Sequence, residues 1–103
     1  MSNLTQQQWL EQLQGDTNAV ILDVRTPEEF NSGKIPNSIN IDIYKGQRFI
    51  YMVDELDKSK NFYVYCRSGA RSGQACSVMN KMGIPNAYNL LGGIIQWKGE
   101  IEF

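Results

Sequence analysis

The chain has 103 residues, of which 42% are hydrophobic and 20% charged, and its formal net charge is −1. This length suits one domain with one hydrophobic core, which we expect to cover residues 1–103, and it is short for two. The balanced charge contains no block of like charges, so we expect neither a nucleic-acid partner nor binding to a membrane surface.

The start of the chain has no basic leader, and no apolar run approaches the ~20 residues needed to span a bilayer. We therefore expect a soluble, cytoplasmic protein. The two cysteines, Cys66 and Cys76, do not form a disulfide framework, and without histidine they cannot supply four zinc ligands. No metal or cofactor is predicted. The lack of histidine also removes Cys-His and Ser-His nucleophile pairs, so a nucleophile here has to be activated without imidazole.

The first half of the chain alternates between helix-like and strand-like segments. Residues 5–13 have apolar side chains at helical spacing, and residues 19–22 form a continuous apolar run typical of a parallel strand buried on both faces. Asp23 and Arg25 follow this strand at its carboxyl end, where open α/β sheets place their sites. They are candidates for a supporting ion pair or for orienting a nearby loop.

A capping box follows at Thr26-Pro27-Glu28-Glu29, with Thr26 as the N-cap, Pro27 at the first helical position and Glu29 at the third. It predicts a short helix that ends near Gly33. Glu28 and Glu29 resemble a catalytic carboxylate pair, but carboxylates in a first helical turn are more typical of residues that stabilise the helix dipole.

The same alternation continues to the end of the chain. Strands are predicted at residues 38–41, 62–65 and 87–90, and helices at residues 46–56 and 72–82, the last with Gly83 as its C-cap. Strands that alternate with helices predict an α/β fold, a three-layer α/β/α sandwich on a mostly parallel sheet.

The most informative segment is Cys66-Arg67-Ser68-Gly69-Ala70-Arg71-Ser72, which joins a strand to a helix. A helix start offers unpaired N–H groups and a positive dipole end, so a thiolate at Cys66 is stabilised there and its pKa should be low. We expect Arg67 and Arg71 to stabilise the thiolate and to capture an anionic donor.

The other loop residues are small. Gly69 has no side chain and Ala70 a small one, so the loop backbone can curl toward its own centre. Ser68 and Ser72 offer hydroxyl donors, and Ser72 is also a candidate N-cap. Cys76 lies on the helix face with apolar residues, which favours a core position over a resolving thiol.

Three separated segments together resemble the rhodanese-like domains: residues 21–30 with 33–40, the Cys66 loop and residues 91–97. The resemblance implies a five-stranded parallel sheet with helices on both faces and a sulfurtransferase activity. It implies that Cys66 carries a transferred sulfur as a persulfide, with thiosulfate or another sulfane-sulfur compound as donor and cyanide or a cellular thiol as acceptor. Asp23 and Arg25 would then be supporting residues. Lys34 departs from the pattern, because many members have histidine there.

Two alternatives stay open. One is a persulfide carrier or binding module that serves a specific protein partner. The other, weaker, is phosphatase or arsenate reductase chemistry. Phosphatase relatives of the family have a cysteine, five residues and then an arginine, whereas Ser72 occupies that sixth position after Cys66. The shorter loop suits a terminal sulfur better than a tetrahedral oxyanion.

Overall fold

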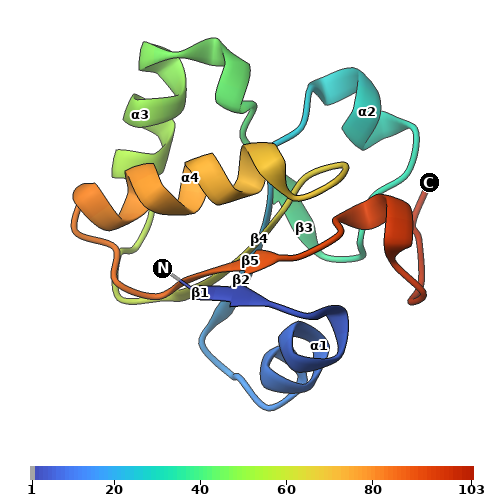
Figure 1. The fold of residues 1–103 in the computed structure, drawn as a ribbon. Helices are drawn as coiled ribbons and strands as arrows, with labels where there is room; N and C mark the ends of the chain where they lie inside the picture. Colours follow the sequence, from blue (N-terminus) through green and yellow to red (C-terminus); the bar gives the residue numbers. More distant parts are fainter. Residues whose placement is uncertain (1) are drawn as a thin grey trace.

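The computed structural model describes residues 2–103 and contains one five-stranded sheet between helices (Figure 1). Every strand pairing is parallel, and the strand order is β1-β5-β4-β2-β3. The strands are β1 (Ser2–Leu4), β2 (Ala19–Asp23), β3 (Ser38–Asn40), β4 (Asn61–Tyr65) and β5 (Ala87–Leu90). The predicted α/β fold with a parallel five-stranded sheet is confirmed.

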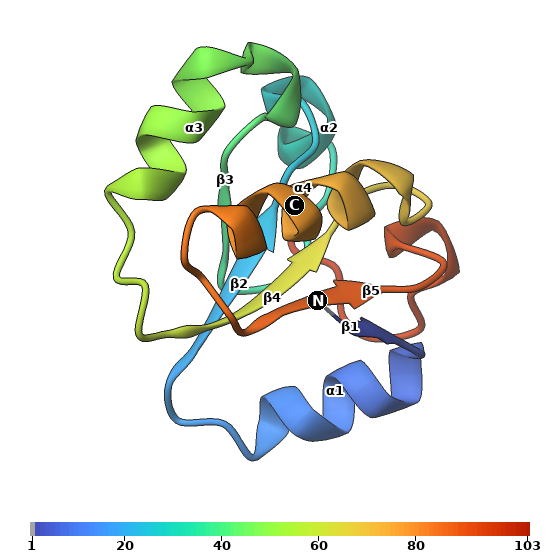
Figure 2. The ribbon, with the colours of Figure 1, turned by 60° about the vertical axis from the view of Figure 1, so that its left-hand side comes forward.

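Helices cover both faces of this sheet. They are α1 (Gln6–Gln14), α2 (Pro27–Asn31), α3 (Gln47–Asp54) and α4 (Ala70–Lys81), with two short 3₁₀ turns, η1 (Ile43–Lys45) and η2 (Ile94–Gln96). Figures 1 and 2 show α1 on one face of the sheet and α3 and α4 on the other. Among residues 2–103, no helix is both long and apolar enough to cross a membrane.

The central strand β4 shows why two layers of helices are needed. Phe62 and Val64 contribute to the core that contains α3 and α4, whereas Tyr63 and Tyr65 contribute to a second core with Trp9 of α1. Side chains alternate between the two faces of a strand, so a strand that is apolar on both faces requires cover on both.

The carboxyl ends of β2 and β4 lie side by side. Asp23 pairs with Tyr65 in the register of the sheet, and Val24 N–H donates to the Tyr65 carbonyl at 3.1 Å. Cys66 is the next residue of the chain. The Asp23–Arg25 segment and the Cys66 loop, which are far apart in the sequence, therefore meet at one edge of the sheet.

The structure corrects two predicted helix ends and adds a strand. Helix α4 begins at Ala70, with left-handed Gly69 as its N-cap, so the predicted N-cap role of Ser72 is wrong. Glycine takes the left-handed conformation without steric cost, which lets the loop enter the helix two residues earlier. At the other end the C-cap is Met82, one residue before Gly83. Strand β1 was not predicted from the sequence.

Candidate functional site

The sulfur of Cys66 lies inside its own loop. Cys66 is only 1% exposed, and the Gly69 N–H donates to its Sγ at 3.1 Å. The Ser72 hydroxyl donates to the same Sγ from the first turn of α4, at 3.3 Å. A sulfur surrounded by donors on its protein side is suited to carry negative charge.

The pKa of Cys66 reflects two opposed effects. Burial by itself raises the pKa of this thiol, but hydrogen bonds from the Ser72 hydroxyl and from backbone N–H groups of Ser72, Gly69 and Ser68 outweigh it, so the pKa is lowered. The helix start thus supplies the donors that the sequence predicted, and these hydrogen bonds are the main causes that lower the pKa of Cys66.

A polar network behind the loop depends on Asn89 of β5, a residue that the sequence analysis did not single out. Its Oδ1 accepts from the Ser72 hydroxyl at 2.5 Å, and its Nδ2 donates to the Gly69 carbonyl at 3.2 Å and to Asn3 Oδ1 at 2.9 Å. A single asparagine in a strand of mixed residues carries no signal of this role, because the contacts depend on the packing of α4 against β5.

The backbone of the loop is held by the turn after β5. Ile94 N–H donates to the Cys66 carbonyl at 3.0 Å, and Ile95 N–H donates to the Arg67 carbonyl at 3.1 Å. Gly93 has a φ of +63° and contacts the Arg67 carbonyl so closely that a Cβ would overlap it. The Gly92-Gly93 pair therefore permits a close backbone approach to the loop.

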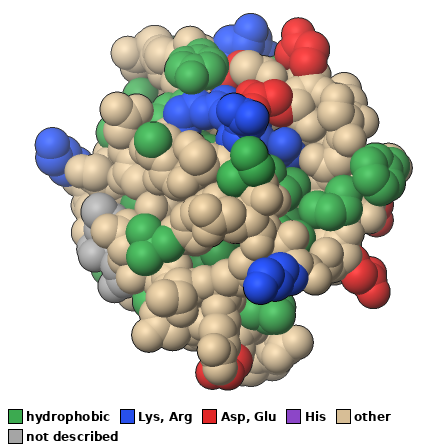
Figure 3. Space-filling view, turned by 45° about the vertical axis from the view of Figure 1, so that its right-hand side comes forward, with side chains coloured by type: hydrophobic (Ala, Val, Ile, Leu, Met, Phe, Trp, Pro, Cys, Tyr) green, Lys and Arg blue, Asp and Glu red, His purple; other side chains and the backbone are tan. Residues whose placement is uncertain are grey.

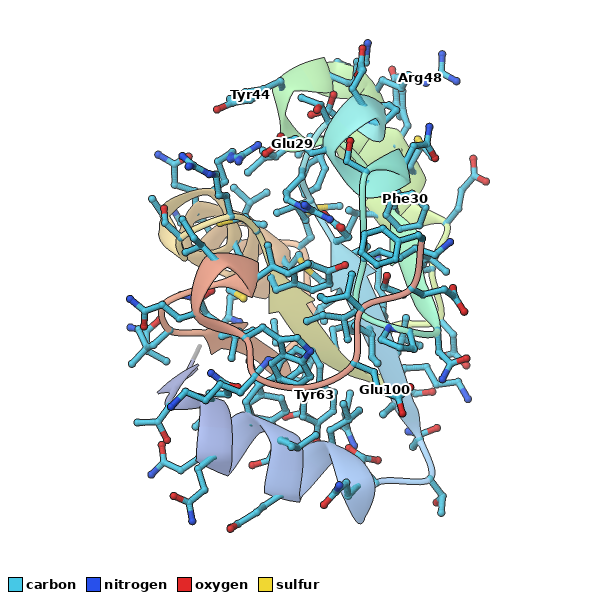
Figure 4. The ribbon with its side chains drawn as sticks, turned by 90° about the vertical axis from the view of Figure 1, so that its right-hand side faces the viewer. Glu29, Phe30, Tyr44, Arg48, Tyr63 and Glu100 are labelled. Carbon is cyan, nitrogen blue, oxygen red and sulfur yellow. The ribbon has the colours of Figure 1, made fainter. Side chains whose placement is uncertain are left out.

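Arg71 is engaged in an ion pair on the loop's outer side. Its guanidinium contacts Glu29 of α2 through two bonds, Nη1 to Oε1 at 2.7 Å and Nη2 to Oε2 at 3.0 Å, and it lies over the Tyr44 ring at 5.3 Å. Figure 4 shows Glu29 and Tyr44 in the same upper part of the molecule. Glu29 also keeps its predicted place in the capping box with Thr26. Its pairing with an arginine 42 residues away was not predicted.

Arg67 differs from Arg71, because its side chain is exposed and, within residues 2–103, has no ion pair or hydrogen bond. It lines a groove of about 500 Å³ together with Arg25, Glu28, Glu29, Ser32, Ile94 and Ile95. In the space-filling view of Figure 3, basic, acidic and hydrophobic side chains lie next to one another on one face. The groove thus combines both charge signs with an apolar wall.

Asp23 and Arg25 form a buried ion pair at the groove's floor. Arg25 Nη2 lies 2.7 Å from Asp23 Oδ2, and the two side chains are 7% and 0% exposed. The same Nη2 donates to the Gly33 carbonyl at 2.8 Å, and the guanidinium lies over the Tyr65 ring. Arg25, which lines the groove, thus links Asp23 at the end of β2 to the turn after α2.

Comparison with known proteins decides the family, because the sequence model of the rhodanese-like domain family matches residues 6–100 of this chain. The chain belongs to the rhodanese-like domain family. A sulfurtransferase from Allochromatium vinosum is 38% identical over 98 residues, which cover 94% of this chain and 89% of that protein. The crystal structure of a rhodanese-like domain protein from Staphylococcus aureus superposes with a TM-score of 0.84 and 29% identity, over 100% of this chain and 98% of that one.

Relatives within the rhodanese-like family differ in what their names describe. A putative sulfur carrier protein, YrkF of Bacillus subtilis, is 30% identical over 92 residues, which cover 89% of this chain and 48% of that protein. At the level of the family, these relatives support a role in sulfur transfer.

The remaining predicted residues of the rhodanese-like loop lie at the surface. Ser68 and Ala70 are exposed, and Ser68 contributes its backbone N–H to Cys66.

Cys76 is fully buried among apolar residues of the core, as expected for a core position. Burial raises the pKa of Cys76 to about 12, so this thiol stays protonated at neutral pH.

Proposed function

We propose that the protein transfers a sulfane sulfur from a donor such as thiosulfate to cyanide or a cellular thiol through a persulfide on Cys66. The observation that carries this proposal is the set of donors around Sγ, namely Gly69 N–H at 3.1 Å and the Ser72 hydroxyl at 3.3 Å. They lower the pKa of Cys66 and so favour its thiolate, which is the nucleophile of the proposed first step. No imidazole is needed, because a thiolate attacks sulfur without a general base.

The reaction proceeds in two displacements. In the first, the Cys66 thiolate attacks the outer sulfur of thiosulfate, a new S–S bond forms, and the S–S bond of thiosulfate breaks so that sulfite leaves with the electron pair. In the second, cyanide or a thiolate attacks the outer sulfur of the persulfide, and Cys66 leaves as thiolate. No net oxidation of the protein occurs, and two moderate steps replace one difficult one.

The proposed partners are therefore a small sulfane-sulfur donor and a thiol or cyanide acceptor. Arg67, the exposed cation of the loop, is proposed to attract the donor. Arg71 is proposed to act from a distance, since its guanidinium is already paired with Glu29. The free thiols suit the cytoplasm, where cysteines are kept reduced, and we propose that location.

Mass spectrometry after incubation with thiosulfate tests the proposal. We expect a mass increment of one sulfur atom on Cys66, no increment in Cys66→Ala, and normal loading in Cys76→Ala, since Cys76 lies in the core. Persistence of full turnover in Cys66→Ala, or absence of the increment in the parent protein, would show that the proposal is wrong.

A second candidate is a persulfide carrier that serves one protein partner, and the similarity to the putative sulfur carrier protein favours it. Such a carrier would accept sulfur on Cys66 and release it slowly to small thiols. Steady-state turnover with thiosulfate and cyanide separates the two candidates: an enzyme turns over many times, whereas a carrier stops after one loading. Phosphatase or arsenate reductase chemistry remains the weaker alternative, and hydrolysis of an aryl phosphate or reduction of arsenate would revive it.

A further inference from the structure

The carboxylate of Glu29 accepts hydrogen bonds from both terminal nitrogens of the Arg71 guanidinium. Both bonds of this pair, at 2.7 and 3.0 Å, are short enough for charge-assisted hydrogen bonds. The side chains are 17% and 29% exposed, so the pair is only partly solvated. Glu29 remains ionised at neutral pH, because its hydrogen bonds with Arg71 hold its pKa near 2. The positive charge of Arg71 is thus neutralised by a group of the protein.

The charged side chains around the groove divide into those that have an ion-pair partner and those that do not. Arg25 is paired with Asp23, and Arg71 is paired with Glu29. Among the described residues that line the groove, Arg67 is the cation without a partner, and Glu28 is an exposed carboxylate that also lines it. One unpaired cation beside one unpaired anion gives no net attraction for a second negative charge on a ligand.

We propose that Glu29 is a specificity-determining residue, which occupies Arg71 and so keeps the site from preferring doubly charged sulfane-sulfur donors over singly charged ones. The inference rests on the proposed function of Cys66. Arg71 belongs to the loop around that sulfur and directly precedes Ser72, whose hydroxyl donates to Cys66 Sγ at 3.3 Å. The charge of Cys66 also contributes to the raised pKa of Arg71. An anion bound at Cys66 would therefore sense whether Arg71 is neutralised.

The capping box offers a variant that changes the charge and preserves the helix. Glu29 accepts from the Thr26 N–H at 3.1 Å, and glutamine is equally suited to this third position of a capping box. Glu29→Gln thus removes the negative charge from Arg71 while keeping the helix start. Glu28→Gln is the matched control, because it removes the same charge from the same groove without releasing Arg71.

A binding experiment tests the inference without any sulfur transfer. Sulfate and methanesulfonate differ by one negative charge, and each is measured for its ability to protect Cys66 from alkylation by iodoacetamide at constant ionic strength. We expect the two anions to protect the parent at similar concentrations. In Glu29→Gln we expect sulfate to protect at about fivefold lower concentration, with less change for methanesulfonate, and the difference should shrink at high salt.

The same comparison is made in turnover with thiosulfate and methanethiosulfonate, which donate the same kind of sulfur with two charges and one. Glu29→Gln should lower KM for thiosulfate about fivefold relative to methanethiosulfonate, with less change in kcat. The inference fails if the parent prefers sulfate by fivefold, if Glu29→Gln leaves the ratio unchanged, or if Glu28→Gln shifts it equally. If anion protection shifts as expected but Cys66 takes up no sulfur, the inference stands and the proposed function fails.

Discussion

Ser72 Oγ lies 3.3 Å from Cys66 Sγ and donates to it, although Ser72 belongs to a helix and Cys66 to the end of a strand. Its hydroxyl is also 2.5 Å from Asn89 Oδ1 and has one proton for both acceptors. The negative charge of a thiolate attracts this proton more strongly than a neutral amide does, so Ser72 stabilises the charged form of Cys66.

Replacing Ser72 by alanine should raise the pKa of Cys66, because its hydroxyl is the largest of the contributions that lower it. We expect sulfur uptake at neutral pH to fall about tenfold, the effect of losing one hydrogen bond to a charged group. The pH dependence of Cys66 alkylation measures the pKa directly. Ser77→Ala, an exposed site on the same helix, serves as control, and an unmoved profile in Ser72→Ala would contradict the assignment.

Gly93 should not tolerate a side chain. Both Gly93→Ala and Gly83→Ala place alanine at a positive φ, which costs about 1–3 kcal/mol. Around Gly83 a Cβ meets nothing within 4 Å, whereas at Gly93 it overlaps the Arg67 carbonyl and Ser68 N. Urea unfolding should therefore show a larger loss for Gly93→Ala, together with slower loading of Cys66. Equal losses in the two variants would mean that the close approach has no energetic weight.

The buried ion pair should matter far more than an exposed one with the same N···O distance. Asp23–Arg25 and Asp54–Lys58 both have an N···O distance of 2.7 Å, but the second pair is exposed. Asp23→Asn leaves the Arg25 guanidinium buried without its counter-charge and should cost about 3–5 kcal/mol. Asp54→Asn should cost less than about 1 kcal/mol. Denaturant unfolding of the two variants checks this; similar values would contradict the role of burial.

Acid should weaken the fold in part through Glu29. The hydrogen bonds with Arg71 lower the pKa of Glu29 from 4.5 to about 2, so its stabilising effect is present above pH 4.5. It is lost as the pH falls through 4.5 towards 2, because the folded protein must then bind a proton that the unfolded chain has already bound. We expect Glu29→Gln to be about 1 kcal/mol less stable at neutral pH, allowing for solvent screening, and equal to the parent near pH 2. Unfolding curves across this range measure the convergence.

Features that depend on nearby residues could be predicted from the sequence. The Thr26 capping box, with Glu29 at its third position, is present as predicted, because all of its partners lie within four residues. The apolar run at 19–22 became β2, and the glycine-containing loop after β4 leads into α4. Local patterning thus determined most elements and placed Cys66 at a helix start.

Features that depend on distant contacts could not be predicted from the sequence. Strand β1 is three residues long and forms through its parallel pairing with β5, some 86 residues further along the chain. The pairing of Arg71 with a carboxylate on α2, 42 residues away, was not predicted. Asn89 joins Asn3, Gly69 and Ser72 across three elements. Such pairings follow from the strand order, which no short sequence pattern encodes.

With 1% of its surface exposed, Cys66 can be reached only by something narrow. A small anion or a thiol at the tip of a flexible chain can bring its reacting atom to the sulfur, whereas a flat protein surface cannot. In the proposed transfer, acceptors would therefore be selected by shape before they are selected by reactivity. A sulfur atom stored in this loop would also be shielded from bulky reductants, so its lifetime would depend on the entry of a slender acceptor.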